Sequence, residues 1–242
     1  MLICLKYSNT YNMIIDELPE IKIDKSDSKS LRESIIKWLH DGVYSGYLPP
    51  GSRIIESQLA NKFQISRTPV REALFQLESE GLAKIIPNRG AIVNIFSVNE
   101  IAEIHLIFGA LEGVAASLSV EVIDEEGIKK MEDCINKMEV SKEYLNKKEW
   151  FSENDEFHKA FIKPCEKKIL LKLIKNYTKQ VGRYWYLMLS YPGSIQLFHQ
   201  EHKEILEAFK LRNSKMARER VENHVTSFRK VVVESLKMIS SI

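Results

Sequence analysis

Two short helix patterns, separated by only three residues, are the feature that most restricts how this chain can fold. Residues 56–63 place their apolar side chains on one helix face, and residues 64–66 leave room only for a tight turn. A second helix begins at once. Ser66 or Thr68 can serve as its N-cap, and Pro69 is tolerated in its first turn, where an amide has no intrahelical partner. This arrangement predicts a helix-turn-helix.

The flanking segments extend this unit on both sides. Apolar spacing from residue 28 predicts a preceding helix, which ends within residues 42–51 because two prolines and three glycines favour a turn there. Residues 83–86 and 91–95 have strand patterns, and the Pro-Asn-Arg-Gly between them favours a hairpin turn. We therefore predict a winged helix-turn-helix domain over residues 28–96.

After Ser97 no strand pattern interrupts the chain. Capping or helix-breaking residues separate segments in which apolar residues recur every three or four positions. The fold class predicted is mainly α, with the winged domain followed by an all-helical, six-helix bundle over residues 97–242. Residues 1–27 form a leader whose role the pattern does not indicate. The six predicted helices are 98–119, 124–145, 147–163, 167–190, 194–211 and 213–240.

Charge and cysteine usage narrow the class of protein. The net charge is only +2, but residues 29–97 hold nine Lys or Arg and six acids, so the basic excess lies in the winged segment. Cys4, Cys134 and Cys165 lack metal-ligand spacing and are odd in number, which favours structural thiols and a cytoplasmic location. No apolar run approaches the roughly 20 residues that span a bilayer, so we expect no membrane partner.

The start of the second helix carries the candidate DNA contacts. The first turns of a recognition helix enter the major groove, and Arg67, Thr68 and Arg71 occupy those turns. Arginine can bond bidentately to guanine, while Ser57, Thr68 and the wing residue Arg89 are better suited to phosphates or the minor groove. The alternative is a solvated basic helix in a winged module that binds only protein.

The helical region contains a candidate metal site. Asn154 and His158 lie four residues apart and share a helix face, while His202 and His224 lie on the last two predicted helices, which can pack as antiparallel neighbours. Helical bundles build metal sites from facing helices, and imidazole suits zinc, nickel, iron or manganese. Three histidines with an open coordination position also allow a metal-dependent hydrolase, although Asp155 and Glu156 point away from the shared face.

The residues of the winged segment resemble a known family. The run PPGSRIIESQLANKFQISRTPVREALFQLESEGLAKIIPNRGAIV is similar to the amino-terminal domain of GntR-family regulators. The resemblance implies a homodimeric transcriptional regulator, expected to be a repressor, that binds palindromic double-stranded operator DNA. It implies contacts from Arg67, Thr68 and Arg71, and from the wing around Arg89 and Gly90.

Residues from about 98 to 240 resemble the FCD ligand-binding domain of one GntR subfamily. The resemblance implies that Asn154, His158, His202 and His224 hold a divalent metal, with zinc expected first, and that a small organic-acid effector completes its coordination. A metal-independent, ligand-responsive regulator is the alternative.

Two positions depart from this FCD pattern. Asn154 replaces the usual Asp, and Phe108 replaces an Arg that many members carry, so we expect Arg183 to take part in effector binding instead. Because three imidazoles and an amide bring no charge to a divalent ion, an anionic effector is expected to bind cooperatively with the metal.

Overall fold

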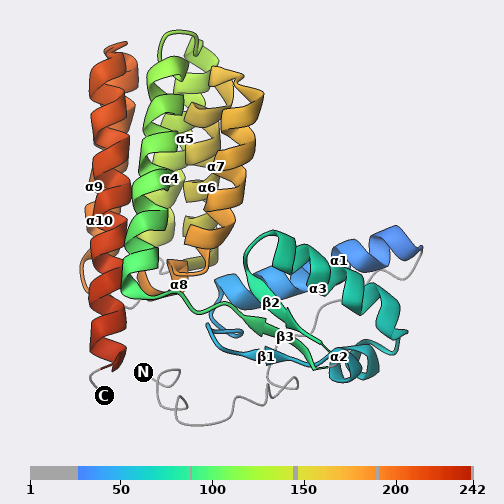
Figure 1. The fold of residues 1–242 in the computed structure, drawn as a ribbon. Coiled ribbons are helices and arrows are strands. Elements are labelled where there is room, and N and C mark those ends of the chain that lie inside the picture. Colours follow the sequence, from blue (N-terminus) through green and yellow to red (C-terminus); the bar gives the residue numbers. More distant parts are fainter. Residues whose placement is uncertain (1–26, 88, 144–146, 189–190, 241–242) are drawn as a thin grey trace. The chain divides into compact units, whose positions relative to one another are not determined.

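A computed structural model describes residues 27–87, 89–143, 147–188 and 191–240, and these form two compact units (Figure 1). The first unit takes in the described chain up to Ser97 together with Lys179–Tyr186, and the second comprises Val98–Thr178 and Leu187–Ile242. The main segment of the first unit ends at Ser97. The sequence pattern did not predict that Lys179–Tyr186 belongs to the first unit. The predicted leader lies outside the described residues except for Asp27, which caps the first helix.

The first unit is a winged helix-turn-helix. Its helices are α1 (Ser28–Tyr44), α2 (Glu56–Phe63) and α3 (Arg67–Ser79), and its strands are β1 (Arg53–Ile54), β2 (Ala83–Ile86) and β3 (Gly90–Val93). The antiparallel sheet has the order β1-β3-β2. The apolar faces of all three helices meet in one core, in which Trp38 packs edge-on against Phe63 at a centroid distance of 5.1 Å. This core fixes α3 on the unit and leaves its opposite face exposed.

The second unit is a helical bundle. Its elements are α4 (Val98–Ser119), α5 (Glu125–Glu143), α6 (Lys147–Ile162), the short 3-10 helix η3 (Lys163–Cys165), most of α7 (Lys168–Gly182), the end of α8 (Trp185–Met188), α9 (Ser194–Lys210) and α10 (Ser214–Ser240). Helix α10 lies along α4 (Figure 1) and also packs against α9, while α5 packs against α6 and α9. Five predicted helices are confirmed with small changes at their ends. The single helix predicted over residues 167–190 is wrong, because the chain breaks at Gly182 into α7 and α8.

Helix α4 combines high hydropathy with burial. Among the described residues it is the one helix long and apolar enough, by length and composition, to cross a membrane. The sequence expectation that no segment approaches this length therefore needs correction. The core helix of a bundle has the same composition, and Ile101, Phe108 and Ala115 of α4 are buried within the unit.

Candidate functional site

The amino-terminal turns of α3 form an exposed, donor-rich surface. The helix begins at Arg67, and Arg67, Thr68 and Arg71 are all exposed, while Ser57 on α2 is half-buried. Ser66 is the N-cap in extended conformation, but its side chain makes no capping hydrogen bond, contrary to the sequence expectation. The first amides of α3 therefore lack a side-chain cap and suit an external acceptor such as a phosphate oxygen.

Arg71 is held in place by an acidic side chain from the neighbouring helix. Its Nε lies 3.3 Å from both carboxylate oxygens of Glu56, and its Nη2 lies 3.0 Å from Oε2. The hydrogen bond and charge of Glu56 raise the pKa of Arg71. The guanidinium thus has a defined direction before any DNA is bound.

The wing carries Arg89 at an exposed position between β2 and β3, as the sequence predicts. Gly90 is different, because it is buried and has a φ of 87°. A Cβ at this position would lie 2.0 Å from the carbonyl oxygen of Ile54. Gly90 therefore allows β3 to pass close to β1, and this steric need is sufficient to explain the glycine, while its DNA contact stays a prediction.

Three histidines meet in the interior of the second unit. His158 of α6, His202 of α9 and His224 of α10 each offer a ligand nitrogen, and these atoms lie within 4.8 Å of one another. The ring centroids of His202 and His224 are 4.6 Å apart, and those of His158 and His224 are 5.3 Å apart. The structure thus confirms that these three predicted ligands converge. They form the only group of three or more potential metal ligands found among the described residues.

Burial disfavours protonation of this cluster. Burial, followed by the nearby histidines His224 and His158, keeps the pKa of His202 well below its usual value. Burial also lowers the pKa of His224, although a hydrogen bond to Glu201 opposes the shift. Neutral imidazole is the form that binds metal. The lowered pKa values of His202 and His224 thus favour the form of these two rings that a divalent ion needs.

Neither ring nitrogen of His202 has a hydrogen-bond partner among the described residues, although the side chain is fully buried. Buried polar atoms are nearly always bonded in native proteins, so this pair requires an explanation. A metal ion bound to one of the two nitrogens would account for that nitrogen. The donor set and its burial therefore fit a divalent cation.

Two carboxylates lie directly behind this cluster, and the sequence reasoning missed both. Oε2 of Glu112 on α4 is 3.2 Å from Nδ1 of His158, and Oε2 of Glu201 on α9 is 2.8 Å from Nδ1 of His224. The signals for them were a charged residue within the most apolar helix of the chain and an acidic residue directly before His202. Charged side chains are rarely buried without a partner, so Glu112 was a candidate on that ground alone.

Small residues on α4 bring these groups together. A Cβ at Gly109 would lie 3.3 Å from Val225, and one at Gly113 would lie 2.8 Å from Glu222, both on α10. The two glycines are one helical turn apart and let α10 approach α4 closely. This close approach places His224 on the side of the bundle where Glu112 projects from α4.

The remaining predicted site residues have different positions. Asn154 is half-buried on α6, one turn before His158, and so lies on the expected helix face. Arg183 belongs to the first unit, where its Nη1 and Nη2 donate to the carbonyls of Asn94 and Gly81 at 2.9 and 2.8 Å. Its guanidinium also stacks over Phe96 at 4.6 Å. Because these groups engage the guanidinium, they support a structural role for Arg183, and its effector contact stays a prediction.

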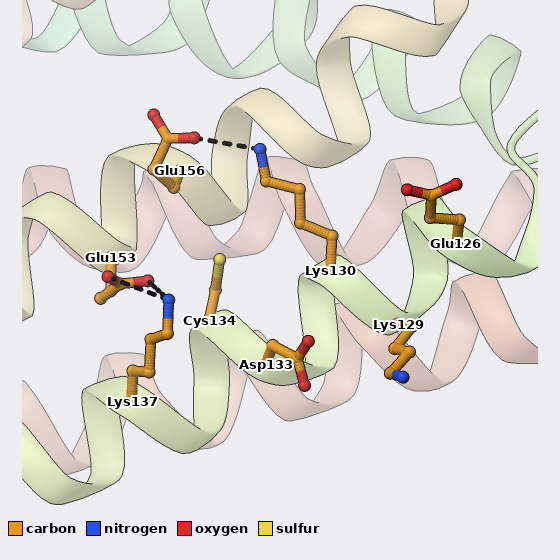
Figure 2. Close-up of a pocket in the computed structure, with 8 residues that line it drawn as sticks. All are labelled: Glu126, Lys129, Lys130, Asp133, Cys134, Lys137, Glu153 and Glu156. Atoms are coloured by element: carbon orange, nitrogen blue, oxygen red, sulfur yellow. Dashed lines mark hydrogen bonds and ion pairs between the residues drawn. The ribbon is translucent and has the colours of Figure 1, made fainter.

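A groove between α5 and α6 is a further candidate site among the described residues (Figure 2). Two ion pairs bridge the helices there, Lys130 to Glu156 at 3.1 Å and Lys137 to Glu153 at 3.5 Å. Burial, with the charge of Glu153, raises the pKa of Cys134 to about 11, so its thiol stays protonated and unreactive at neutral pH. The groove is thus a solvated, self-paired surface, and Cys134 has the structural role predicted for it.

A winged helix-turn-helix with an exposed basic recognition helix, joined to a helical domain with its own buried polar cluster, defines a DNA-binding transcriptional regulator. Comparison with known proteins agrees. The family described as "Bacterial regulatory proteins, gntR family" matches residues 31–93, and the FCD domain matches residues 103–227, which is more than half of the chain. The chain therefore belongs to the GntR family of bacterial regulators, in the group that carries an FCD domain.

Individual relatives cover nearly the whole chain. It is 23% identical to the HTH-type transcriptional repressor RspR of Escherichia coli K12, over 90% of this chain and 94% of RspR. It is 27% identical to the HTH-type transcriptional regulator YdhC of Bacillus subtilis, over 86% and 92% of the two chains. Among solved structures, Escherichia coli McbR/YncC shares the fold with a TM-score of 0.71 at 21% identity, covering 87% of this chain and 97% of that one.

Proposed function

We propose that this protein is a homodimeric repressor that binds a palindromic operator and responds to a small organic-acid effector. The observation that carries the DNA-binding role is the exposed set Arg67, Thr68 and Arg71 on the first turns of α3, with Arg71 oriented by Glu56. Arg89 of the wing and Ser57 of α2 supply phosphate or minor-groove contacts beside them. The regulator acts in the cytoplasm, where its operator lies.

The test of this role is a titration of the protein's own promoter fragment at fixed salt. Arg71→Ala should weaken specific binding by about 10- to 100-fold per half-site, because a bidentate base contact contributes roughly 1–3 kcal/mol of discrimination. Lys37→Ala is the matched control, since Lys37 is an exposed cation on α1 and pairs with Asp41. If the wild type and Arg71→Ala had equal affinity and equal sequence preference, the amino-terminal turns of α3 would be excluded as the surface that reads the operator.

For the second unit we propose that His158, His202 and His224 hold one divalent ion, zinc first, with the amide oxygen of Asn154 as the fourth protein ligand. The support is the burial of His202 and the absence of hydrogen bonds to its ring. The three histidines and Asn154 would hold the ion, which when bound would supply Lewis-acid chemistry suited to an organic acid. Phe157 and Phe198 pack against His202 and His224 and limit the access of water.

Elemental analysis of protein purified without chelator or affinity tag tests the metal site. One equivalent of metal is expected, and His202→Ala should lose both the metal and the rise in Tm on metal addition. His105→Ala is a suitable control, because His105 is a buried histidine of α4 outside the cluster, bonded to the carbonyl of Ile101. Metal-free native protein, or a His202→Ala variant that responds like the wild type, would favour the metal-independent regulator.

A metal-dependent hydrolase has less support. Asp155 and Glu156 both pair with Lys159 on the outer face of α6, and the Glu112 carboxylate is engaged by His158. None of these is positioned as a separate base for water attack. The winged unit also has no use in a hydrolase.

A further inference from the structure

Two of the three clustered histidines have a carboxylate at the same ring nitrogen. Glu112 lies against Nδ1 of His158 and Glu201 against Nδ1 of His224, at 3.2 and 2.8 Å. A carboxylate can only accept from an imidazole, so the proton of each ring sits on Nδ1. The lone pair then sits on Nε2 of both rings. His202 has no such partner among the described residues, so nothing there selects its tautomer.

The same carboxylates bring negative charge into the interior. The side chain of Glu112 is only 2% exposed and that of Glu201 only 16%. Burying charge is costly unless an opposite charge compensates it. A divalent cation between the rings has the charge that balances two carboxylates.

We infer that Glu112 and Glu201 are positioning residues of the proposed metal site. They fix His158 and His224 as Nε2 ligands and balance the ion's charge, so that the metal is retained without an effector. This inference rests on the proposed function and revises one part of it. The sequence suggested that an anionic effector must neutralise the ion, whereas here the protein does so itself. The organic acid is then an exchangeable ligand of a resident metal.

The test is zinc titration of the chelator-treated full-length chain against a competing chromophoric chelator. Glu112→Gln keeps an oxygen acceptor for Nδ1 and removes the charge, while Glu112→Ala removes both. We expect each change to weaken zinc binding by about 10- to 100-fold, with Ala the more damaging, because carboxylate partners of ligating histidines typically have effects of this size. Glu201→Gln is the second variant. Because the Glu201 side chain is more exposed than that of Glu112, we expect this variant to fold even if Glu112→Gln misfolds.

The matched control is Glu204→Gln, three residues after Glu201 on α9, where Glu204 pairs with Arg220 at 2.7 Å. It should bind zinc like the wild type. Acetate provides a readout that a purely structural role would not change. It should alter the zinc affinity of the wild type by less than about threefold and restore part of the affinity of Glu112→Gln, because it replaces the missing charge.

The outcomes separate the two proposals. Wild-type protein that binds no zinc removes the metal site itself. Wild-type protein that binds one equivalent, together with Glu112→Gln and Glu201→Gln variants of equal affinity, overturns the role of the carboxylates alone. A wild type that binds zinc only when acetate is present would also overturn it.

Discussion

Nδ1 of His158 on α6 lies 3.2 Å from Oε2 of Glu112 on α4, although 46 residues separate them in the chain. This pair joins the helix that begins the bundle to the histidine cluster in its interior. It also shows that the cluster has acidic partners of its own.

Gly90→Ala should destabilise the wing and reduce operator affinity. A positive φ costs an L-residue roughly 1–2 kcal/mol, and here a Cβ would also collide with the Ile54 carbonyl. Gly193→Ala is the matched control, because Gly193 also has a positive φ of 77° but has nothing within 4 Å of its Cβ position. Thermal melts should show a larger fall in Tm for Gly90→Ala than for Gly193→Ala. Equal falls in Tm would mean that the wing can move away from β1.

The stability of the first unit should decline in acid through Glu80. Burial opposes ionisation of this carboxyl, but hydrogen bonds from His40, Lys179 and Gln76 outweigh it and lower the pKa from 4.5 to about 2. A folded-state pKa below the unfolded value gives stability that is complete above about pH 4.5 and lost towards pH 2.

Glu80→Gln tests this sign. The variant should be less stable than the wild type at pH 7, and the difference in Tm should shrink as the pH falls from 4.5 towards 2. Glu72→Gln, an exposed position on the same helix, should show no such convergence. A difference between wild type and Glu80→Gln that stays constant from pH 7 to pH 3 would contradict the assignment.

Arg183→Ala should weaken the first unit while leaving the metal site intact. Its loss removes donors from the carbonyls of Gly81 and Asn94, and buried groups left without partners cost about 1–3 kcal/mol each. We expect a lower Tm and weaker operator binding, with unchanged zinc affinity and an unchanged response to organic acids. Loss of the organic-acid response at full zinc affinity would restore the effector role that the sequence suggested.

The proposed homodimer should depend on exposed apolar residues of α4. Leu106, Ile107 and Leu118 are exposed apolar residues of this helix, and apolar patches of this kind often mark subunit contacts. Light scattering should give twice the chain mass of 28.0 kDa for the wild type and a smaller mass for Leu106→Glu. Ile169→Glu places the same charge at an exposed position of α7, and this variant should remain dimeric. A wild-type protein that is monomeric and still binds the operator with full affinity would contradict the proposed homodimer.

The sequence by itself determined the parts of this protein that depend on local spacing. Short helices around a three-residue turn, a hairpin with Pro-Asn-Arg-Gly and apolar periodicity after Ser97 were sufficient to predict the winged unit and most of the bundle. The positions of Arg67, Thr68 and Arg71 on the exposed first turns of α3 followed from the same spacing. Such patterns are readable because helix periodicity and turn chemistry act within a few residues.

Only the tertiary structure decided what lies next to the histidines and to Arg183. Packing of α6 and α10 against α4 makes Glu112 a partner of the cluster, and no spacing in the sequence specifies that contact. Arg183 lies within a predicted helix of the bundle, yet its guanidinium binds carbonyls of the first unit. Hydrogen bonding and charge compensation of buried groups depend on which segments meet in space. The number of residues between two segments in the sequence does not specify whether they meet.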